Sequence, residues 1–205
     1  MSAYFGVNEI GRVKEGERFV VSSAAGSVGS IAGQICKIIG ARVVGIAGGQ
    51  EKCKWVINEL GFDDCIDYQS ENVSQRLSEI FPEGIDVYFD NVGGEILDNI
   101  LTKIRMKGRI ILSGAISSYG SQNFYPLRNY RFLTTRRARM EGFIVTDYYE
   151  RFGEAYKQLR AWVTDGRIRQ KEQLFRGLER APDIFMNLFT GKNFGKQILQ
   201  ITDYP

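Results

Sequence analysis

The chain has 205 residues, of which 43% are hydrophobic and 25% are charged, and its formal net charge at pH 7 is +3. This length allows one substantial hydrophobic core. The small net charge argues against a nucleic acid or a membrane surface as the partner. The sequence contains no histidine, which excludes a His-based catalytic triad and most metal sites, so no metal is predicted.

No segment approaches the ~20 apolar residues of a membrane-spanning helix, and the first residues lack the basic and apolar regions of a signal peptide. The three cysteines are Cys36, Cys53 and Cys65. Their number is odd and their spacing matches no zinc motif. Unpaired cysteines without a secretion signal indicate a reducing compartment, so the sequence predicts a cytoplasmic protein.

Short apolar runs alternate with amphipathic stretches over the first two thirds of the chain. The predicted strands are, in chain order, residues 18–22, 42–47, 64–68, 85–89, 108–114 and 139–145. The predicted helices between them are residues 30–39, 51–60, 73–80 and 95–106. Such alternation indicates βαβ units with right-handed crossovers. The expected fold is therefore α/β, a doubly wound Rossmann domain with a parallel six-stranded sheet.

The alternation changes after about residue 147. Residues 148–164 and 179–189 have the pattern of amphipathic helices, and residues 195–201 have that of a closing strand, which needs a sheet to join. We therefore expect two parts: a dinucleotide-binding domain over residues 1–147 and a C-terminal helical and strand segment over residues 148–205.

The most specific motif follows the first predicted strand. Residues Ala24 to Gly29 fit the dinucleotide fingerprint G-x-G-x-x-G with alanine in the first glycine position. Gly26 would let the backbone approach a pyrophosphate, and Gly29 would let the following helix pack on the strand. The N-terminus of that helix would offer N–H groups to the phosphates. The alternative is an ordinary strand-to-helix turn.

The end of the second predicted strand indicates which dinucleotide is bound. NAD sites usually place a carboxylate there for the ribose 2′-hydroxyl, but this chain has Ala47–Gln50 and then Lys52 and Lys54. Small residues leave room for a 2′-phosphate and a lysine can pair with it, so NADP(H) is the expected cofactor. Glu51 counts against this interpretation, and both lysines could instead be solvated helix residues.

With these residues in place, the chain resembles a zinc-independent branch of the medium-chain dehydrogenase/reductases. This branch contains leukotriene B4 12-hydroxydehydrogenases, prostaglandin reductases, curcumin-reductase-like proteins and alkenal double-bond reductases. The resemblance covers nearly the whole chain. The segments that carry it are Ala3–Gly6, Ala24–Ser30, Gly33–Gln34, Gly49–Lys52, Leu60–Asp63, Phe89–Gly94, Ser113–Ser117, Arg139–Phe143 and Gly191–Lys196.

The resemblance implies which residues contact the cofactor. The pyrophosphate would lie on the phosphate turn, the adenosine end on Lys52 and Tyr68, and the nicotinamide side on the later segments. The implied residues are Gly26, Ser27, Val28, Gly29, Lys52, Tyr68, Asn91, Ser113, Gly114, Ala115, Ile116, Ser117, Tyr119, Phe143, Ile144, Val145 and Asn193. Tyr68, Asn91, Phe143 and Asn193 also have purely structural interpretations as strand-end, turn or core residues.

Members of this branch begin with a GroES-like substrate barrel, and the resemblance implies that this barrel is absent from the chain. The tail would normally return to it, so Trp162, Phe185 and Phe189 are expected to be partly exposed. The branch often carries a tyrosine that assists protonation. Thr135 is at the matching position here, which leaves Tyr130 as the candidate. A homodimer through the Rossmann sheet edges is also implied.

The expected activity is NADPH-dependent reduction of the C=C bond of α,β-unsaturated ketones or aldehydes, with the cofactor supplying the chemistry. An NADPH quinone oxidoreductase of the same superfamily is an alternative enzyme, with a quinone as the small-molecule substrate. A non-catalytic nucleotide-binding module is the alternative from another class, and it would bind NADPH without turnover.

Overall fold

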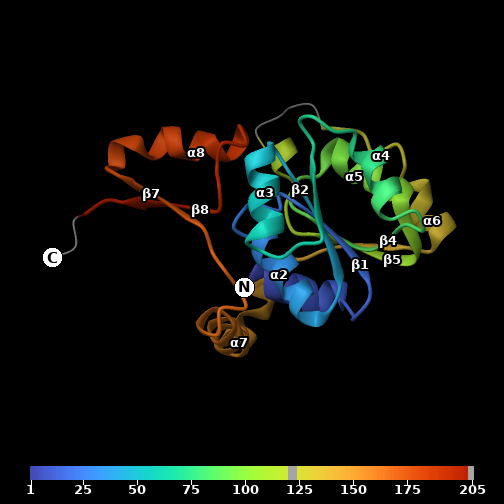
Figure 1. The fold of residues 1–205 in the computed structure, drawn as a ribbon, viewed down its shortest axis with the longest axis horizontal. Coiled ribbons are helices and arrows are strands. Elements are labelled where there is room, and N and C mark those ends of the chain that lie inside the picture. The colour runs from blue at the N-terminus through green and yellow to red at the C-terminus, as the bar shows by residue number, and fades with distance from the viewer. Residues whose placement is uncertain (120–123, 203–205) are drawn as a thin grey trace.

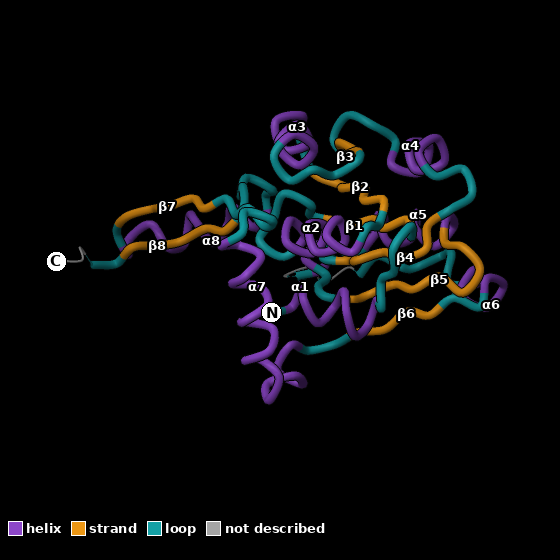
Figure 2. The backbone as a smooth tube through the Cα atoms, turned by 60° about the horizontal axis from the view of Figure 1, so that its bottom comes forward, coloured by secondary structure: helices purple, strands orange, loops and turns teal. Residues whose placement is uncertain are grey.

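A parallel sheet with helices on both faces forms most of the molecule (Figures 1 and 2). In the computed structural model, residues 1–119 and 124–202 are described. Within them, six strands form one parallel sheet in the order β3-β2-β1-β4-β5-β6. The strands are β1 Arg18–Ser22, β2 Arg42–Ala47, β3 Asp64–Asp67, β4 Ile85–Asp90, β5 Ile104–Leu112 and β6 Arg139–Gly142. The predicted doubly wound sheet is confirmed, and the strand order reverses between β1 and β4, where such folds bind their ligands.

The two faces of the sheet are covered by different helices. One hydrophobic cluster joins the sheet to the N-terminal turns, α2 and α3, and the other joins it to α4 and α5. In β1, Phe19 and Val21 belong to the first cluster and Val20 to the second. Both faces of the strand are thus buried, which explains its continuous apolar run. The helices are α2 Gly29–Ile39, α3 Gln50–Asn58, α4 Val73–Ile80, α5 Gly94–Lys103 and α6 Arg131–Arg136.

The predicted boundary between the helix over residues 95–106 and the strand over residues 108–114 was wrong, and the strand predicted over residues 139–145 ends at Gly142. The helix expected to reach residue 106 ends at Lys103, and β5 begins at Ile104. The cause is an irregularity: the β4–β5 register shifts between Ile85 and Val87, and Lys107 has a φ of 60°. These features form an irregular stretch of strand near Gly108, where a Cβ would lie 2.5 Å from Ile104 Cγ1. An irregularity of this kind leaves no periodic pattern in the sequence, so the sequence could not predict the boundary.

The long helix predicted from residue 148 is divided. A 3-10 turn, η3 (Val145–Arg151), comes first and α7 (Phe152–Thr164) follows. The break lies at Tyr148, whose φ of −107° and ψ of 18° are not helical. Its ring stacks on Phe5, with ring centroids 4.6 Å apart. A tertiary contact therefore overrides the helical pattern.

The N-terminal segment forms α1 (Ser2–Phe5) and a π-helical turn, η1 (Gly6–Gly11), directly against the sheet. Gly6 makes this approach possible, because a Cβ there would lie 2.6 Å from the Phe89 ring. No helix in the described part of the chain is long and apolar enough to cross a membrane.

The C-terminal segment forms a small unit that extends from the main sheet (Figures 1 and 2). The closing strand β8 (Lys196–Gln200) pairs in parallel with β7 (Glu172–Arg176), which was not predicted. Between them lie η4 (Leu178–Arg180) and α8 (Ala181–Phe189). Phe185 and Phe189 are exposed and Trp162 is half-buried against Tyr4, so the expected partial exposure is confirmed.

Candidate nucleotide-binding site

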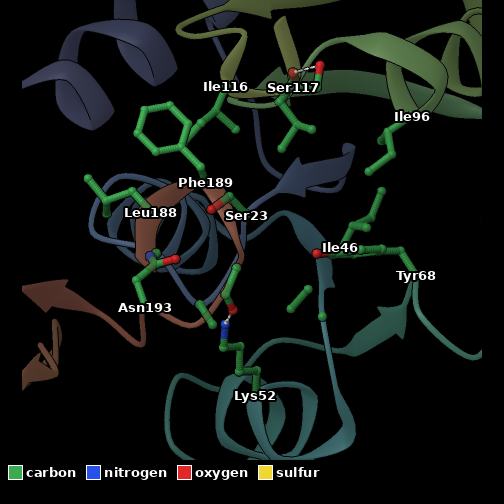
Figure 3. A pocket seen from close by; sticks show the side chains of 16 residues that line it. Ser23, Ile46, Lys52, Tyr68, Ile96, Ile116, Ser117, Leu188, Phe189 and Asn193 are labelled. Atoms are coloured by element: carbon green, nitrogen blue, oxygen red, sulfur yellow. Dashed lines mark hydrogen bonds between the residues drawn. The ribbon is translucent and has the colours of Figure 1, made fainter. Parts of the chain in front are cut away.

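A cavity of about 260 Å³ opens at the carboxyl ends of β1, β2 and β4, where the strand order reverses (Figure 3). The last residues of α8 and the loop that follows it cover one side. The residues that line the cavity are Ser23, Ala25, Gly26, Ile46, Ala47, Gly48, Lys52, Tyr68, Val92, Ile96, Ile116, Ser117, Leu188, Phe189, Gly191 and Asn193. Six of them were implied by the sequence: Gly26, Lys52, Tyr68, Ile116, Ser117 and Asn193.

The phosphate turn has the geometry that its glycines require. A Cβ on Gly29 would lie 2.3 Å from the carbonyl oxygen of Ser23, and a Cβ on Gly26 would lie 2.8 Å from Ser23 Oγ. Gly26 N–H donates to the carbonyl oxygen of Ser23 at 2.8 Å, which closes the turn. Helix α2 then starts at Gly29. The N–H groups of Ser30 and Ala32 already donate to the carbonyl oxygens of Gly26 and Val28, at 3.0 and 2.9 Å, so the helix offers a ligand the positive end of its dipole. The turn therefore suits an anionic group at the mouth of the cavity.

Ser27 and Val28 belong to the same turn, but their side chains face elsewhere. Both line a separate cavity of about 440 Å³, together with the N-terminal residues and the start of β7. Any contact that they make with a pyrophosphate would come from their backbone N–H groups.

Lys52 and Tyr68 lie at the far end of the cavity, beyond β2. Lys52 Nζ donates to the carbonyl oxygen of Gly191 at 2.5 Å, and burial lowers the pKa of Lys52, an effect that Glu51 partly offsets. Tyr68 is 44% exposed. A Cβ on Gly48 would lie 2.9 Å from the Tyr68 hydroxyl, so the absence of a side chain at Gly48 leaves space beside the ring.

A carboxylate does lie close to this end of the cavity, but it is directed into the backbone. Asp67 ends β3 and is 5% exposed. Its carboxylate accepts from Gly49 N–H at 2.7 Å, from the Ser70 hydroxyl at 2.8 Å and from Gln69 N–H at 3.1 Å. Burial acts to raise the pKa of Asp67, but these donors outweigh it and leave the pKa below its usual value. Asp67 thus holds the turn after β2 and leaves Lys52 as the charged side chain of the cavity wall.

A second cavity, of about 840 Å³, continues from the first on the other side of Ser117, which lines both. It is mainly apolar and aromatic. Of the residues implied for the nicotinamide side, it is lined by Ser113, Gly114, Ala115, Ser117, Tyr119, Phe143 and Ile144. The structure therefore arranges the adenosine-side and nicotinamide-side residues along one continuous path.

Besides Ser27, Val28 and Gly29 of the phosphate turn, three described residues that the sequence singled out line neither cavity. Asn91 turns inward, where its Nδ2 donates to the carbonyl oxygen of Ser22 at 2.8 Å. Val145 lies in η3, beyond the wall formed by Phe143 and Ile144. Tyr130 is 65% exposed at the start of α6, so the structure does not bring the candidate catalytic tyrosine to the site.

Other lining residues were missed by the sequence analysis. In the first cavity, Leu188, Phe189 and Gly191 come from the C-terminal segment, far from the phosphate turn in the sequence. In the second, Phe124 and Tyr125 come from the loop before α6. Their aromatic and glycine content was visible, but no local pattern relates them to the sheet. Only the tertiary fold brings them to the site.

Comparison with known proteins agrees with this geometry. The family described as zinc-binding dehydrogenase matches residues 27–163. The NADPH-dependent curcumin reductase of Escherichia coli is 39% identical over 206 residues, which is 98% of this chain and 60% of that protein. The NADP(+)-dependent 2-alkenal reductase of Nicotiana tabacum is 39% identical over 203 residues, or 98% of this chain and 59% of the relative.

Solved structures give the same result. The crystal structure of CurA from Vibrio vulnificus in complex with NADPH superposes with a TM-score of 0.93 and is 42% identical. The match covers 99% of this chain and 62% of CurA. The chain therefore spans about three fifths of the length of these relatives.

Proposed function

Because the chain belongs to the zinc-binding dehydrogenase family of the medium-chain dehydrogenase/reductases, we propose that it binds NADPH along the path formed by the two cavities. The 2′-phosphate would lie at Lys52 beside Tyr68, the pyrophosphate at Gly26–Gly29, and the nicotinamide in the second cavity. The observation that carries this proposal is the end of β2: a lysine faces the cavity while Asp67 is hydrogen-bonded to the backbone. That arrangement favours a phosphate over a free ribose hydroxyl.

We further propose that the protein reduces the C=C bond of α,β-unsaturated ketones or aldehydes. The bound cofactor would supply the hydride. This chain would orient it, with Ser113–Ser117 on one wall and Phe143 and Ile144 on another. The apolar and aromatic lining would exclude water from the reacting carbon. The relatives named for curcumin and 2-alkenal reduction support this substrate class.

The described residues do not fit the zinc site that the family description implies. The sequence has no histidine, and within residues 1–119 and 124–202 no group of three or more His, Cys, Asp or Glu side chains could hold a metal ion. The three cysteines are buried free thiols. We therefore derive no step that uses zinc in this chain.

Residues 1–147 are proposed as the dinucleotide-binding domain, and residues 148–205 as a segment that returns towards a substrate domain. Two contacts support a role of this segment in the cofactor site. Gly195 N–H donates to the carbonyl oxygen of Ala25 at 2.8 Å, and Asn193 lines the first cavity. We also propose a cytoplasmic location, which the free cysteines support, and a homodimer through the edges of the sheet, with light scattering as its test.

Calorimetric titration with NADPH and then with NADH tests the binding proposal. Tight binding of NADPH and weak binding of NADH is the expected result. Binding of neither, or equal binding of both, would contradict the assigned 2′-phosphate site. A turnover assay with an enone and with a quinone then tests the activity. Turnover of the enone supports the proposed reaction, preference for the quinone supports the other enzyme, and binding without turnover supports a nucleotide-binding module.

A further inference from the structure

Asp90, at the end of β4, is a buried carboxyl group in the lining of the second cavity; burial raises its pKa, and the proposed function leaves its role unexplained. Its side chain is 1% exposed. One carboxylate oxygen, Oδ1, accepts four hydrogen bonds, from Tyr88 hydroxyl at 2.8 Å, Gly93 N–H at 2.9 Å, Val92 N–H at 3.0 Å and Ser22 hydroxyl at 3.2 Å. The other oxygen, Oδ2, has no partner among the described residues. Burying a carboxyl group that has one unpaired oxygen costs free energy, so its presence at this place calls for an explanation.

The bonds to Oδ1 fix the turn that joins β4 to α5. Gly93 and Gly94 in this turn both have positive φ values, 73° and 61°. Because glycine loses more conformational entropy on folding than other residues, the turn requires hydrogen bonds that hold its conformation. Ser22 adds a link to β1, since its hydroxyl oxygen also accepts Asn91 N–H at 2.9 Å. The Asp90 side chain therefore holds the ends of β1 and β4 relative to one another.

The same turn carries a wall of the cofactor path. The carbonyl oxygen of Val92 accepts both the hydroxyl of Ser117, at 2.6 Å, and its N–H, at 3.1 Å. The backbone carbonyl of Asp90 accepts Ser113 N–H at 2.9 Å and Gly114 N–H at 3.1 Å. Ser117 lines both cavities, at their junction. A displacement of the turn would consequently move the residues that separate the adenosine side from the nicotinamide side.

We propose that Asp90, which itself lines the second cavity, is a positioning residue that sets the nicotinamide half of the NADPH path through the Val92–Gly93 turn and Ser117. This inference rests on the proposed NADPH site. A positioning role predicts different effects of an Asp90 substitution on two ligands, whereas a general stabilising role predicts the same effect on both. Adenosine 2′,5′-bisphosphate would occupy only the end of the first cavity formed by Lys52 and Tyr68, with which Asp90 makes no hydrogen bond, whereas NADPH must also pass Val92 and Ser117.

The test measures the dissociation constants of both ligands for the full chain and its variants. Loss of hydrogen bonds to a charged group gives an expected weakening of NADPH binding by about tenfold in Asp90→Ala. Binding of adenosine 2′,5′-bisphosphate should stay within about twofold, well below the tenfold step that 1.4 kcal/mol represents. Asp90→Asn keeps an acceptor at the Oδ1 position and should recover most of the NADPH affinity. Hydrogen exchange should become faster at the amides of Val92, Gly93 and Ser117 in Asp90→Ala.

Ser22→Ala is the milder variant, in case Asp90→Ala does not fold. It removes the hydroxyl between Asp90 and Asn91 and should weaken NADPH selectively, in the same direction. Thr102→Ala is its matched control, because the one bond of that hydroxyl among the described residues is to the carbonyl oxygen of Asn99, at 2.7 Å, within α5. Equal weakening of both ligands, or no change in NADPH binding, would overturn the positioning role. If the unaltered chain binds neither ligand, the proposed NADPH site itself fails, and the inference fails with it.

Discussion

Lys52 Nζ donates to the carbonyl oxygen of Gly191, a residue 139 positions later in the chain. This contact joins α3 to the loop that follows α8 and places a half-buried ammonium group at the end of the cofactor path. Burial lowers the pKa of Lys52, which means that its charged form is poorly solvated there. A phosphate dianion would provide the counter-charge that the Gly191 carbonyl supplies only as a dipole.

Replacement of this lysine should therefore discriminate between the two dinucleotides. Lys52→Ala should weaken NADPH binding by about 1–3 kcal/mol, the range for a charge-assisted hydrogen bond, and should hardly affect NADH. Titration calorimetry measures both. Lys54→Ala is the matched control, because Lys54 is exposed on the same helix and does not line the cavity. An equal loss for the two nucleotides would refute the 2′-phosphate assignment.

Substitutions of the two glycines in the phosphate turn should have different effects, one on nucleotide binding and the other on stability. Gly26→Val should abolish binding of NADPH and NADH alike, because a side chain would occupy the turn that faces the cavity. Gly29→Ala should instead lower the free energy of unfolding, by about 1–3 kcal/mol for an overpacked contact, since its Cβ would lie 2.3 Å from a backbone oxygen. Ligand titration and chemical denaturation separate the two effects.

A third glycine serves as the control for these substitutions. Gly153 lies in α7, and a Cβ there would meet nothing within 4 Å. Gly153→Ala should raise stability by up to about 1 kcal/mol through helix propensity and leave nucleotide binding unchanged. A Gly29→Ala variant as stable as Gly153→Ala would contradict the close packing of α2 on the sheet.

Asp67 gives the fold a predictable pH dependence. Its pKa is lowered in the folded chain, so its carboxylate stabilises the fold above the unfolded pKa, and this contribution is lost as the pH falls through the folded pKa. Asp67→Ala should cost about 1–3 kcal/mol at neutral pH, where backbone donors lose a charged acceptor. Denaturant unfolding at pH 7 and near pH 3 measures the difference, which should shrink in acid. A pH-independent difference would show that the charge is not the cause.

The cysteines should be inert towards thiol reagents in the native chain. Burial raises the pKa of Cys36, and a hydrogen bond with Cys53 together with burial raises the pKa of Cys65. The same bond lowers the pKa of Cys53, but that thiol is buried too. Reaction with an aromatic disulfide should be slow until denaturant is added, when all three thiols should react. Rapid labelling of Cys53 or Cys65 in the native chain would contradict the packing of α3 on β3.

The sequence predicts the sheet well because its strands are buried on both faces. Phe19 to Val21 form a continuous apolar run, which is typical of a strand buried on both faces. Gly29 is required at the contact of α2 with Ser23. Asp67 shows the opposite case. Its role depends on the N–H group of Gly49, which lies in the loop after β2. From the sequence, only the presence of a carboxylate at the end of a strand could be predicted. The same holds for Asp90, which lies within the segment Phe89–Gly94 that carries the resemblance, because one of its four donors is Ser22, far from it in the sequence.

The bond from Gly195 N–H to the carbonyl oxygen of Ala25 has a consequence for biosynthesis. The six-stranded sheet is complete once Gly142 has been made, but the cavity wall still lacks Leu188, Gly191 and Asn193. During translation the sheet can therefore form on the ribosome long before the nucleotide has a closed site to enter. Nucleotide binding should therefore wait for the C-terminal segment, and a nascent polypeptide arrested before β8 should contain the folded sheet but bind no nucleotide.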